Sequence, residues 1–359
     1  MKSIQELREE AQDIGLFLPL IEETDVIGTS ETVHGKQVPT RAVLLMQSAA
    51  DADSSGAPTA QTVARYQDAV RQQQYGIVML EPAAISAEAR TAEGHLALTA
   101  ETAAAFADLV QAVKTASAEA FGTQPLVFAL LDHAGHHALV PCAMEHNETL
   151  PTDAPLLTDM DLTELVIRCG NAAQAAETAG FDGAALNAAD RNLFGESLAA
   201  FHREGKFGGD FDDRTRFVRD CYTAMKMMTH DLLFSIRLSL SDGIAQPNGW
   251  GMAFEDESAP DLYEPALLLK ILRTLYDVQI VVCSIGIPHI SWMLAAEPEP
   301  ELIAVSRLCT CIAMLDSDMQ ENLYLVMPQQ MTDVIPFDAL ASGMIEGEFA
   351  SFAGFLPQA

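Results

Sequence analysis

Eight short apolar runs, separated by segments of helical periodicity, constrain the fold of this chain more than any other feature. Each run is continuously apolar rather than alternating, which is typical of strands that are buried on both faces of a parallel sheet. Four long helix-like stretches lie between them, at residues 100–121, 162–180, 212–230 and 263–276. The repeat predicts a parallel sheet covered by helices. The eight runs occupy residues 42–46, 75–81, 125–131, 183–187, 232–239, 278–284, 323–327 and 349–354.

Eight such repeats in 359 residues favour a (β/α)8 TIM barrel over an open, doubly wound sheet. An open sheet of that class usually has a glycine-rich first crossover, and neither G-x-G-x-x-G nor G-x-x-x-x-G-K-[ST] occurs here. We therefore predict a single TIM-barrel domain over residues 1–359, with loop insertions at 132–160 and 240–262. The loop at 188–212 is also long. All three loops follow strands, so they belong to the C-terminal face, where barrel enzymes keep their active sites.

The acidity of the chain restricts its partners. It has 20 basic and 51 acidic residues, a formal net charge of −31, and no basic cluster. A phosphate backbone or an anionic membrane would be repelled, so we expect neither a nucleic acid nor a membrane as partner. No window supplies about 18 uncharged apolar residues, and the six cysteines are few for such a long chain, so we expect a cytoplasmic protein with reduced thiols. A small molecule or another protein subunit remains as partner, and an oligomer is compatible with this surface.

Several motifs resemble one known family. The stretch GFDGAALNAADRNL (180–193), followed by KFGGDFDDRTRF (206–217), is similar to the GFDG strand and the YGGS-x-ENR-x-RF helix entry of the old yellow enzymes. Further similarity lies at residues 46–66, 75–81, 130–137, 235–239 and 344–354. This resemblance to the NADH:flavin oxidoreductases implies an FMN-binding barrel that reduces activated C=C bonds.

The resemblance also locates catalytic positions, and these depart from the family pattern. A His-x-x-His or His-x-x-Asn pair in the family donates hydrogen bonds to the substrate carbonyl oxygen, and a Tyr two positions later protonates the substrate carbon. The matching residues here are Asn187, Asp190 and Asn192. Negative charge builds on that oxygen, so the Asp190 carboxylate has the wrong sign. Asn187 could donate one bond, whereas Asn192 has no proton to give at an accessible pKa.

The positions for the FMN phosphate differ as well. The family binds this phosphate with backbone N–H groups of a glycine-rich turn after the seventh strand and a Gly-Arg pair after the eighth. Here Pro328 lacks an N–H, and Gln329 and Gln330 disfavour the positive φ that glycine permits. Gly354 is followed by Phe355, so the Arg is missing. Two or three lost charge-assisted bonds, at roughly 1.5–3 kcal/mol each, would weaken FMN binding by about two to six decades.

The flavin-ring positions are mixed. Arg237 matches the Arg beside the flavin N1 and O2 atoms, although an ion pair at a strand end would explain it equally well. Met46 is retained, whereas Leu130 replaces the flavin-binding Gln, and Gln73 and Gln74 replace paired glycines. FMN is therefore the cofactor that the resemblance implies, with weak or no occupancy.

Two further clusters offer other chemistry. A carboxylate group of Glu81, Asp132 and Asp190 at the strand ends could act as acid and base or hold a divalent ion. His289, in SIGIPHISW (284–292), could contact a ligand or cap a helix. Potential metal ligands are densest in one loop, which contains His133, His136, His137, Cys142 and His146.

Three functions are compatible with these patterns. The first is a degenerate family member that binds FMN weakly or not at all and serves as a non-catalytic or partner-dependent subunit. The second is an FMN-dependent NAD(P)H ene-reductase with an altered substrate pocket. The third is metal binding or other barrel chemistry through Asp190 and the histidine loop.

Overall fold

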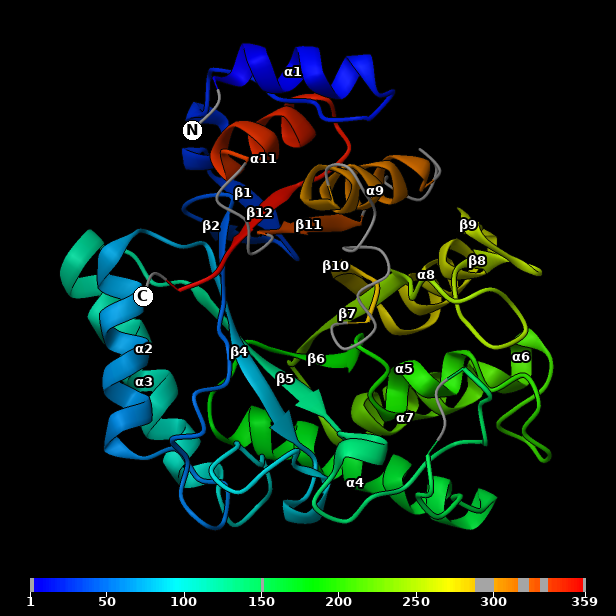
Figure 1. Cartoon of the computed structure of the whole chain (residues 1–359). Helices are drawn as coiled ribbons and strands as arrows, with labels where there is room; N and C mark the ends of the chain where they lie inside the picture. The colour runs from blue at the N-terminus through cyan, green and yellow to red at the C-terminus, as the bar shows by residue number, and fades with distance from the viewer. Residues whose placement is uncertain (1–2, 150–151, 288–299, 316–322, 330–334, 358–359) are drawn as a thin grey trace.

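The computed structural model describes residues 3–149, 152–287, 300–315, 323–329 and 335–357, and its centre is a closed barrel of parallel strands (Figure 1). The strands follow one another around the barrel in the order β10, β11, β12, β3, β4, β5, β6, β7. The predicted fold class is confirmed, and each predicted run overlaps one barrel strand. These strands are β3 (Ala42–Leu45), β4 (Ile77–Ala84), β5 (Leu126–Asp132), β6 (Gly183–Ala188), β7 (Leu233–Ser241), β10 (Val278–Ile285), β11 (Tyr324–Pro328) and β12 (Phe352–Phe355).

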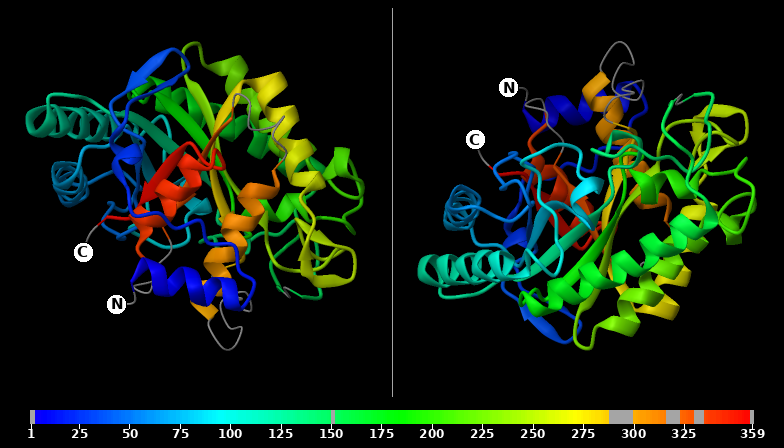
Figure 2. Two further views of the ribbon diagram at one scale, coloured as in Figure 1. Left: turned by 90° about the horizontal axis from the view of Figure 1, so that it is seen from above. Right: turned by 90° about the horizontal axis from the view of Figure 1, so that it is seen from below.

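Helices cover the outside of the barrel, as the two further views in Figure 2 show. Local sequence explains where several of them begin. Thr59 and Thr158 accept hydrogen bonds from the third backbone N–H of their helices, and Thr62 and Asp161 bond back to the cap residues. The helices are α1 (Ile4–Asp13), α2 (Ala60–Gln72), α3 (Ala103–Phe121), α4 (Asp159–Thr178), α5 (Leu193–Leu198), α6 (Phe211–Arg214), α7 (Arg216–Met228), α8 (Tyr263–Tyr276), α9 (Pro300–Met314) and α11 (Phe337–Glu346), with 3-10 turns η1 (Asp25–Gly28), η2 (Ala87–Ala89) and η3 (Gly135–His137).

The barrel has two cores because its side chains alternate between the two faces of each strand. The outer core lies between strands and helices, and the inner core fills the barrel. The hairpin of β1 (Glu31–Val33) and β2 (Lys36–Val38) closes the N-terminal end, because Val33 and Val38 pack into the inner core. Polar chemistry is therefore left to the opposite, C-terminal end.

The long loops after the strands carry structure of their own. In the predicted insertion at 240–262, β8 (Met252–Ala253) pairs antiparallel with β9 (Asp256–Pro260). The insertion at 132–160 contains η3 and a bridge between Ala143 and Leu156. All six cysteines are buried and unpaired. Within the described ranges, no helix combines the length and apolar character needed to cross a bilayer.

Candidate functional site at the barrel mouth

Three polar side chains face the barrel interior toward the C-terminal ends of β5, β6 and β7. Leu130 and Ala185 belong to the inner core, so Asp132 and Asn187, two residues further along their strands, face the same way. Arg237 pairs in register with Asn187 and faces inward by the same alternation. The interior of the barrel therefore changes from apolar to charged at its C-terminal end.

A hydrogen-bond cluster joins Asp132 to two asparagines. The amide nitrogen of Asn187 donates to Asp132 Oδ1 at 3.0 Å, and that of Asn192 donates to the same oxygen and to the backbone oxygen of Asn187. Asn192 Oδ1 accepts from Gly195 N at 3.0 Å and so caps α5. Asn192 thus orders the loop, and one N–H of the Asn187 side-chain amide is directed at Asp132.

The environment of Asp132 disfavours its charge. Burial raises its pKa from the ordinary 3.8 to about 6, although hydrogen bonds from Asn192 and Asn187 and the charge of Arg237 lower it. The nearby Asp190 carboxylate adds to the rise. Asp132 therefore titrates much closer to neutrality than an exposed aspartate does.

Arg237 forms an ion pair with Asp190. Arg237 Nη2 lies 2.8 Å from Asp190 Oδ2, and each side chain is 28% exposed. Arg237 thus forms an ion pair, which is one of the two interpretations that the sequence allowed, and its contact with a flavin stays a prediction. The guanidinium is thus largely neutralised by a residue of the neighbouring loop.

A second ion pair, which the sequence analysis missed, fixes the same loop. Asp190 and Arg191 both adopt left-handed backbone conformations, with φ of 57° and 55°, so adjacent side chains point to different partners. Arg191 Nε lies 2.9 Å from Asp242 Oδ2, and both side chains are almost fully buried. Asp242 also accepts bonds from the backbone N–H groups of Ile244 and Trp250. Nothing local in the sequence indicates this pair, because its members are 51 residues apart.

The positions expected for the FMN phosphate do not fit a phosphate group. The backbone N–H of Gln329 donates to Gly354 O at 2.6 Å, and its side-chain oxygen accepts from Leu356 N at 3.1 Å. Both amides are thereby used within the chain, and Pro328 has none. A Cβ on Gly354 would lie 2.7 Å from a Leu45 methyl group, so this glycine serves packing. Gln330 lies outside the described residues.

The other expected flavin contacts lie in the barrel wall. Met46 is buried, and its backbone N–H donates to Met79 O at 3.1 Å. Leu130 is 3% exposed within the inner core, where it offers no polar group to a flavin ring. His289 lies outside the described residues.

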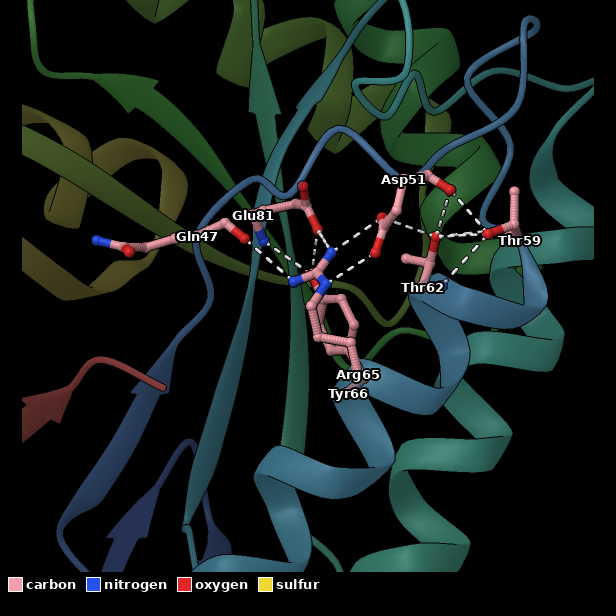
Figure 3. A network of polar contacts seen from close by, with 7 residues as sticks. All are labelled: Gln47, Asp51, Thr59, Thr62, Arg65, Tyr66 and Glu81. Atoms are coloured by element: carbon pink, nitrogen blue, oxygen red, sulfur yellow. Dashed lines mark hydrogen bonds and ion pairs between the residues drawn. The ribbon is translucent and has the colours of Figure 1, made fainter. Parts of the chain in front are cut away.

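The predicted carboxylate group is divided by the barrel wall. Glu81 points to helix α2, where Arg65 Nη2 lies 2.5 Å from its Oε1 atom (Figure 3). Arg65 also contacts Asp51 at 2.9 Å and donates to Gln47 O at 3.1 Å, and Tyr66 Oη accepts from Glu81 N. This network fixes the loop after β3 to the first turns of α2. Glu81 therefore has a structural role, and only the other two predicted carboxylates lie at the mouth.

The histidine loop is ordered by its own contacts. His133 Nδ1 accepts from Gly135 N at 3.1 Å, and burial lowers the pKa of His133 to about 4. His136 Nδ1 lies 4.0 Å from Glu196 Oε2. In the part of the chain that the structure describes, no three His, Cys, Asp or Glu side chains are arranged to hold a metal ion.

The helix entry at 206–217 has a scaffold role. Arg214 is 2% exposed, donates to Gly209 O and Leu198 O, and forms an ion pair with Glu264 at 2.7 Å. Its guanidinium lies 3.6 Å from the centre of the Phe201 ring. These contacts connect the loop after β6 to α8, and none of them needs a cofactor.

Comparison with known sequences identifies related proteins. Residues 36–254 match the model of the NADH:flavin oxidoreductase / NADH oxidase family. An NADPH dehydrogenase of Bacillus pumilus is 31% identical over 180 residues, which are 48% of this chain and 51% of the relative. The NADPH dehydrogenase of Bacillus subtilis is 29% identical over 178 residues, 47% of this chain and 50% of the relative. The alignments thus span about half the length of these relatives.

Solved structures of low identity share the fold. 2-Naphthoyl-CoA reductase in complex with 2-naphthoyl-CoA has a TM-score of 0.74 at 12% identity, over 93% of this chain and 50% of that one. The old yellow enzyme homologue from Zymomonas mobilis has a TM-score of 0.68 at 18% identity, over 92% and 88%. Morphinone reductase in complex with tetrahydroNAD has a TM-score of 0.65 at 17% identity, over 92% and 86%.

Proposed function

Because the chain belongs to the NADH:flavin oxidoreductase / NADH oxidase family, the family of the old yellow enzymes, we propose that it is a diverged member that binds FMN weakly or not at all. In this proposal the protein serves as a non-catalytic or partner-dependent subunit. Its partner is a small molecule or another protein subunit.

The observation that carries the proposal is the internal use of the phosphate-side amides. Gln329 N–H donates to Gly354 O, and Leu356 N–H donates to the Gln329 side chain. A phosphate at this place would have to break these bonds to reach either of the two amides. A buried or half-buried anion without donors is strongly disfavoured.

The polarity of the mouth supports the same proposal. A substrate oxygen that gains negative charge needs hydrogen-bond donors, and each lost donor costs roughly 3 kcal/mol of barrier lowering. Here the Asn187 amide nitrogen faces Asp132, and the Arg237 charge is paired with Asp190. Such an oxygen would lie among two carboxylates and one paired guanidinium.

An FMN-dependent ene-reductase is the second candidate. The closed barrel, the family match and the inward position of Arg237 favour it. In that case flavin binding would depend on ring contacts, and Asn187 would have to rotate toward the substrate. The described residues contain no arrangement of side chains that favours metal chemistry.

The flavin content of the purified full chain tests the proposal. We expect a colourless protein that does not accelerate NADPH oxidation by an activated alkene, even with excess FMN. The NADPH dehydrogenase of Bacillus pumilus, treated identically, serves as the positive control. One FMN per chain in the purified protein, with alkene-dependent NADPH oxidation, would establish the second candidate instead.

A further inference from the structure

The barrel mouth contains a buried hydrogen-bond acceptor that has no donor among the described residues. Asn187 is 4% exposed, its nitrogen faces Asp132, and its Oδ1 atom has no partner within the described part of the chain. The orientation of this amide is fixed, because Asp132 Oδ1 accepts from it and from Asn192, whose own oxygen caps α5. A buried acceptor without a donor is disfavoured, so the site is incomplete without a group that donates to Asn187.

The charges at the mouth do not balance either. Asp132 and Asp190 contribute two negative charges, and Arg237 contributes one positive charge, which leaves one negative charge when Asp132 is ionised. The cation pairs with Asp190, the more exposed of the two carboxylates. Among the described residues, Asp132 accepts hydrogen bonds from the neutral amide N–H groups of Asn187 and Asn192. The uncompensated charge therefore lies beside the unpartnered oxygen of Asn187.

We propose that the barrel mouth binds a small organic ammonium cation, whose N–H groups donate to Asn187 Oδ1 and to the Asp132 carboxylate. This inference rests on the function proposed above in one respect, namely that no tightly bound flavin covers the mouth. The site would thus bind a positively charged hydrogen-bond donor, whereas the carbonyl oxygen of an old yellow enzyme substrate is a hydrogen-bond acceptor.

The other ligand classes satisfy fewer of these groups. A neutral alcohol can donate to Asn187 but leaves the Asp132 charge unbalanced. An anion would be repelled by the two carboxylates. A metal ion would need a set of ligands that the described residues do not provide. A protonated amine supplies both the donors and the charge, and the net charge of −31 raises the local concentration of cations.

The test is a titration of the full chain at about 150 mM salt, where the Debye length is about 8 Å and diffuse attraction is screened. The probes are methylammonium and benzylammonium, with methanol, benzyl alcohol and benzoate for comparison, followed by ligand-observed NMR. We expect benzylammonium to bind at least roughly ten-fold more tightly than benzyl alcohol, the scale of one hydrogen bond to a charged group. Benzoate should show no saturable binding.

Two variants separate the roles of charge and acceptor. Asp132→Asn keeps an oxygen for both asparagines but removes the charge, so it should abolish the preference for ammonium over alcohol. Asn187→Leu removes the unpartnered acceptor and should lower the affinity for both the ammonium and the alcohol at least several-fold. Asp68→Asn removes the same charge from an exposed position on α2 and should change nothing. Circular dichroism spectra verify that each variant is folded.

The pH dependence gives an independent readout. Ammonium binding should strengthen as the pH rises through about 6 in the wild type, because Asp132 ionises there, and Asp132→Asn should lose this dependence. The charged groups that act on Asp132 are Arg237 and Asp190, which form an ion pair with each other.

Equal affinity for ammonium and alcohol, or an unchanged preference in Asp132→Asn, would overturn the inference. So would the absence of saturable binding for both ammonium probes. The absorption spectrum of the same sample separates the two proposals. A colourless protein that binds neither ammonium probe refutes this inference alone. A yellow protein, which contains bound flavin, refutes the proposed function as well.

Discussion

Restoring donors at the phosphate side should create FMN affinity. Gln329→Gly removes the side chain that accepts from Leu356 N and allows a positive φ, and Phe355→Arg places a guanidinium after Gly354. Each change adds one charge-assisted hydrogen bond, at roughly 1.5–3 kcal/mol, so the pair adds roughly 3–6 kcal/mol. That corresponds to a decrease of about two to four decades in the Kd for FMN. The gain is reduced by the packing energy that is lost when the Phe355 ring no longer contacts the rings of Tyr75 and Phe337. Quenching of flavin fluorescence measures the affinity.

Two comparisons make this prediction specific. Riboflavin lacks the phosphate, so the double variant should gain affinity for FMN and not for riboflavin. Phe121→Arg adds the same charge at a half-exposed site at the end of α3, and it should leave the affinity for both flavins unchanged. An equal gain for both flavins, or tight FMN binding already in the wild type, would refute the reasoning.

Three further predictions concern buried carboxylates and their ion pairs. Asp132→Asn should stabilise the protein at pH 7 by up to about 3 kcal/mol in urea unfolding, because the contribution of Asp132 to wild-type stability falls as the pH rises from 3.8 to about 6, by roughly 1.4 kcal/mol per pH unit. Arg191→Met should cost about 3–5 kcal/mol, since it leaves Asp242 buried and unpaired. Arg65→Met should cost about 1–3 kcal/mol and make the loop after β3 sensitive to proteases, because Glu81 loses its charged partner.

Each of these has an outcome that contradicts it. A wild-type stability that rises between pH 4 and 6, and does so equally in Asp132→Asn, would mean that Asp132 is an ordinary ionised carboxylate. The matched control for the two arginine variants is Arg216→Met, which removes an ion pair on the surface with Asp213 and should cost at most about 1 kcal/mol. Costs equal to this control would show that burial adds nothing to the pairs of Arg191 and Arg65.

The barrel could be predicted because its signal is local. Continuously apolar runs and the helices between them are properties of short segments, and closure follows from their number and order. The strand ends differ from the predicted ones by a few residues at most; β4, for example, continues to Ala84, beyond the run at 75–81. The extra residues are Pro82, Ala83 and Ala84, and Pro82 ended the predicted run although it does not end the strand.

The site could be predicted only in part, because its chemistry depends on orientation and on long-range pairs. The sequence placed Asn187 and Arg237 at the mouth, yet it could not indicate that Asp132 turns the amide of Asn187. Asn192 was considered for catalysis, although an asparagine just before LFGESL is also a helix-cap signal. The pair of Arg191 and Asp242 has no local pattern at all.

The most direct test of the central claim is the ratio of the riboflavin and FMN dissociation constants of the wild-type chain. A phosphate-binding site that makes two or three charge-assisted hydrogen bonds makes FMN bind about 10²–10⁶ times more tightly than riboflavin. Because Gln329 N–H and Leu356 N–H are used within the chain, we predict that FMN binds no more tightly than riboflavin. A hundred-fold or greater preference for FMN would show that this barrel still holds the phosphate, and would contradict the account.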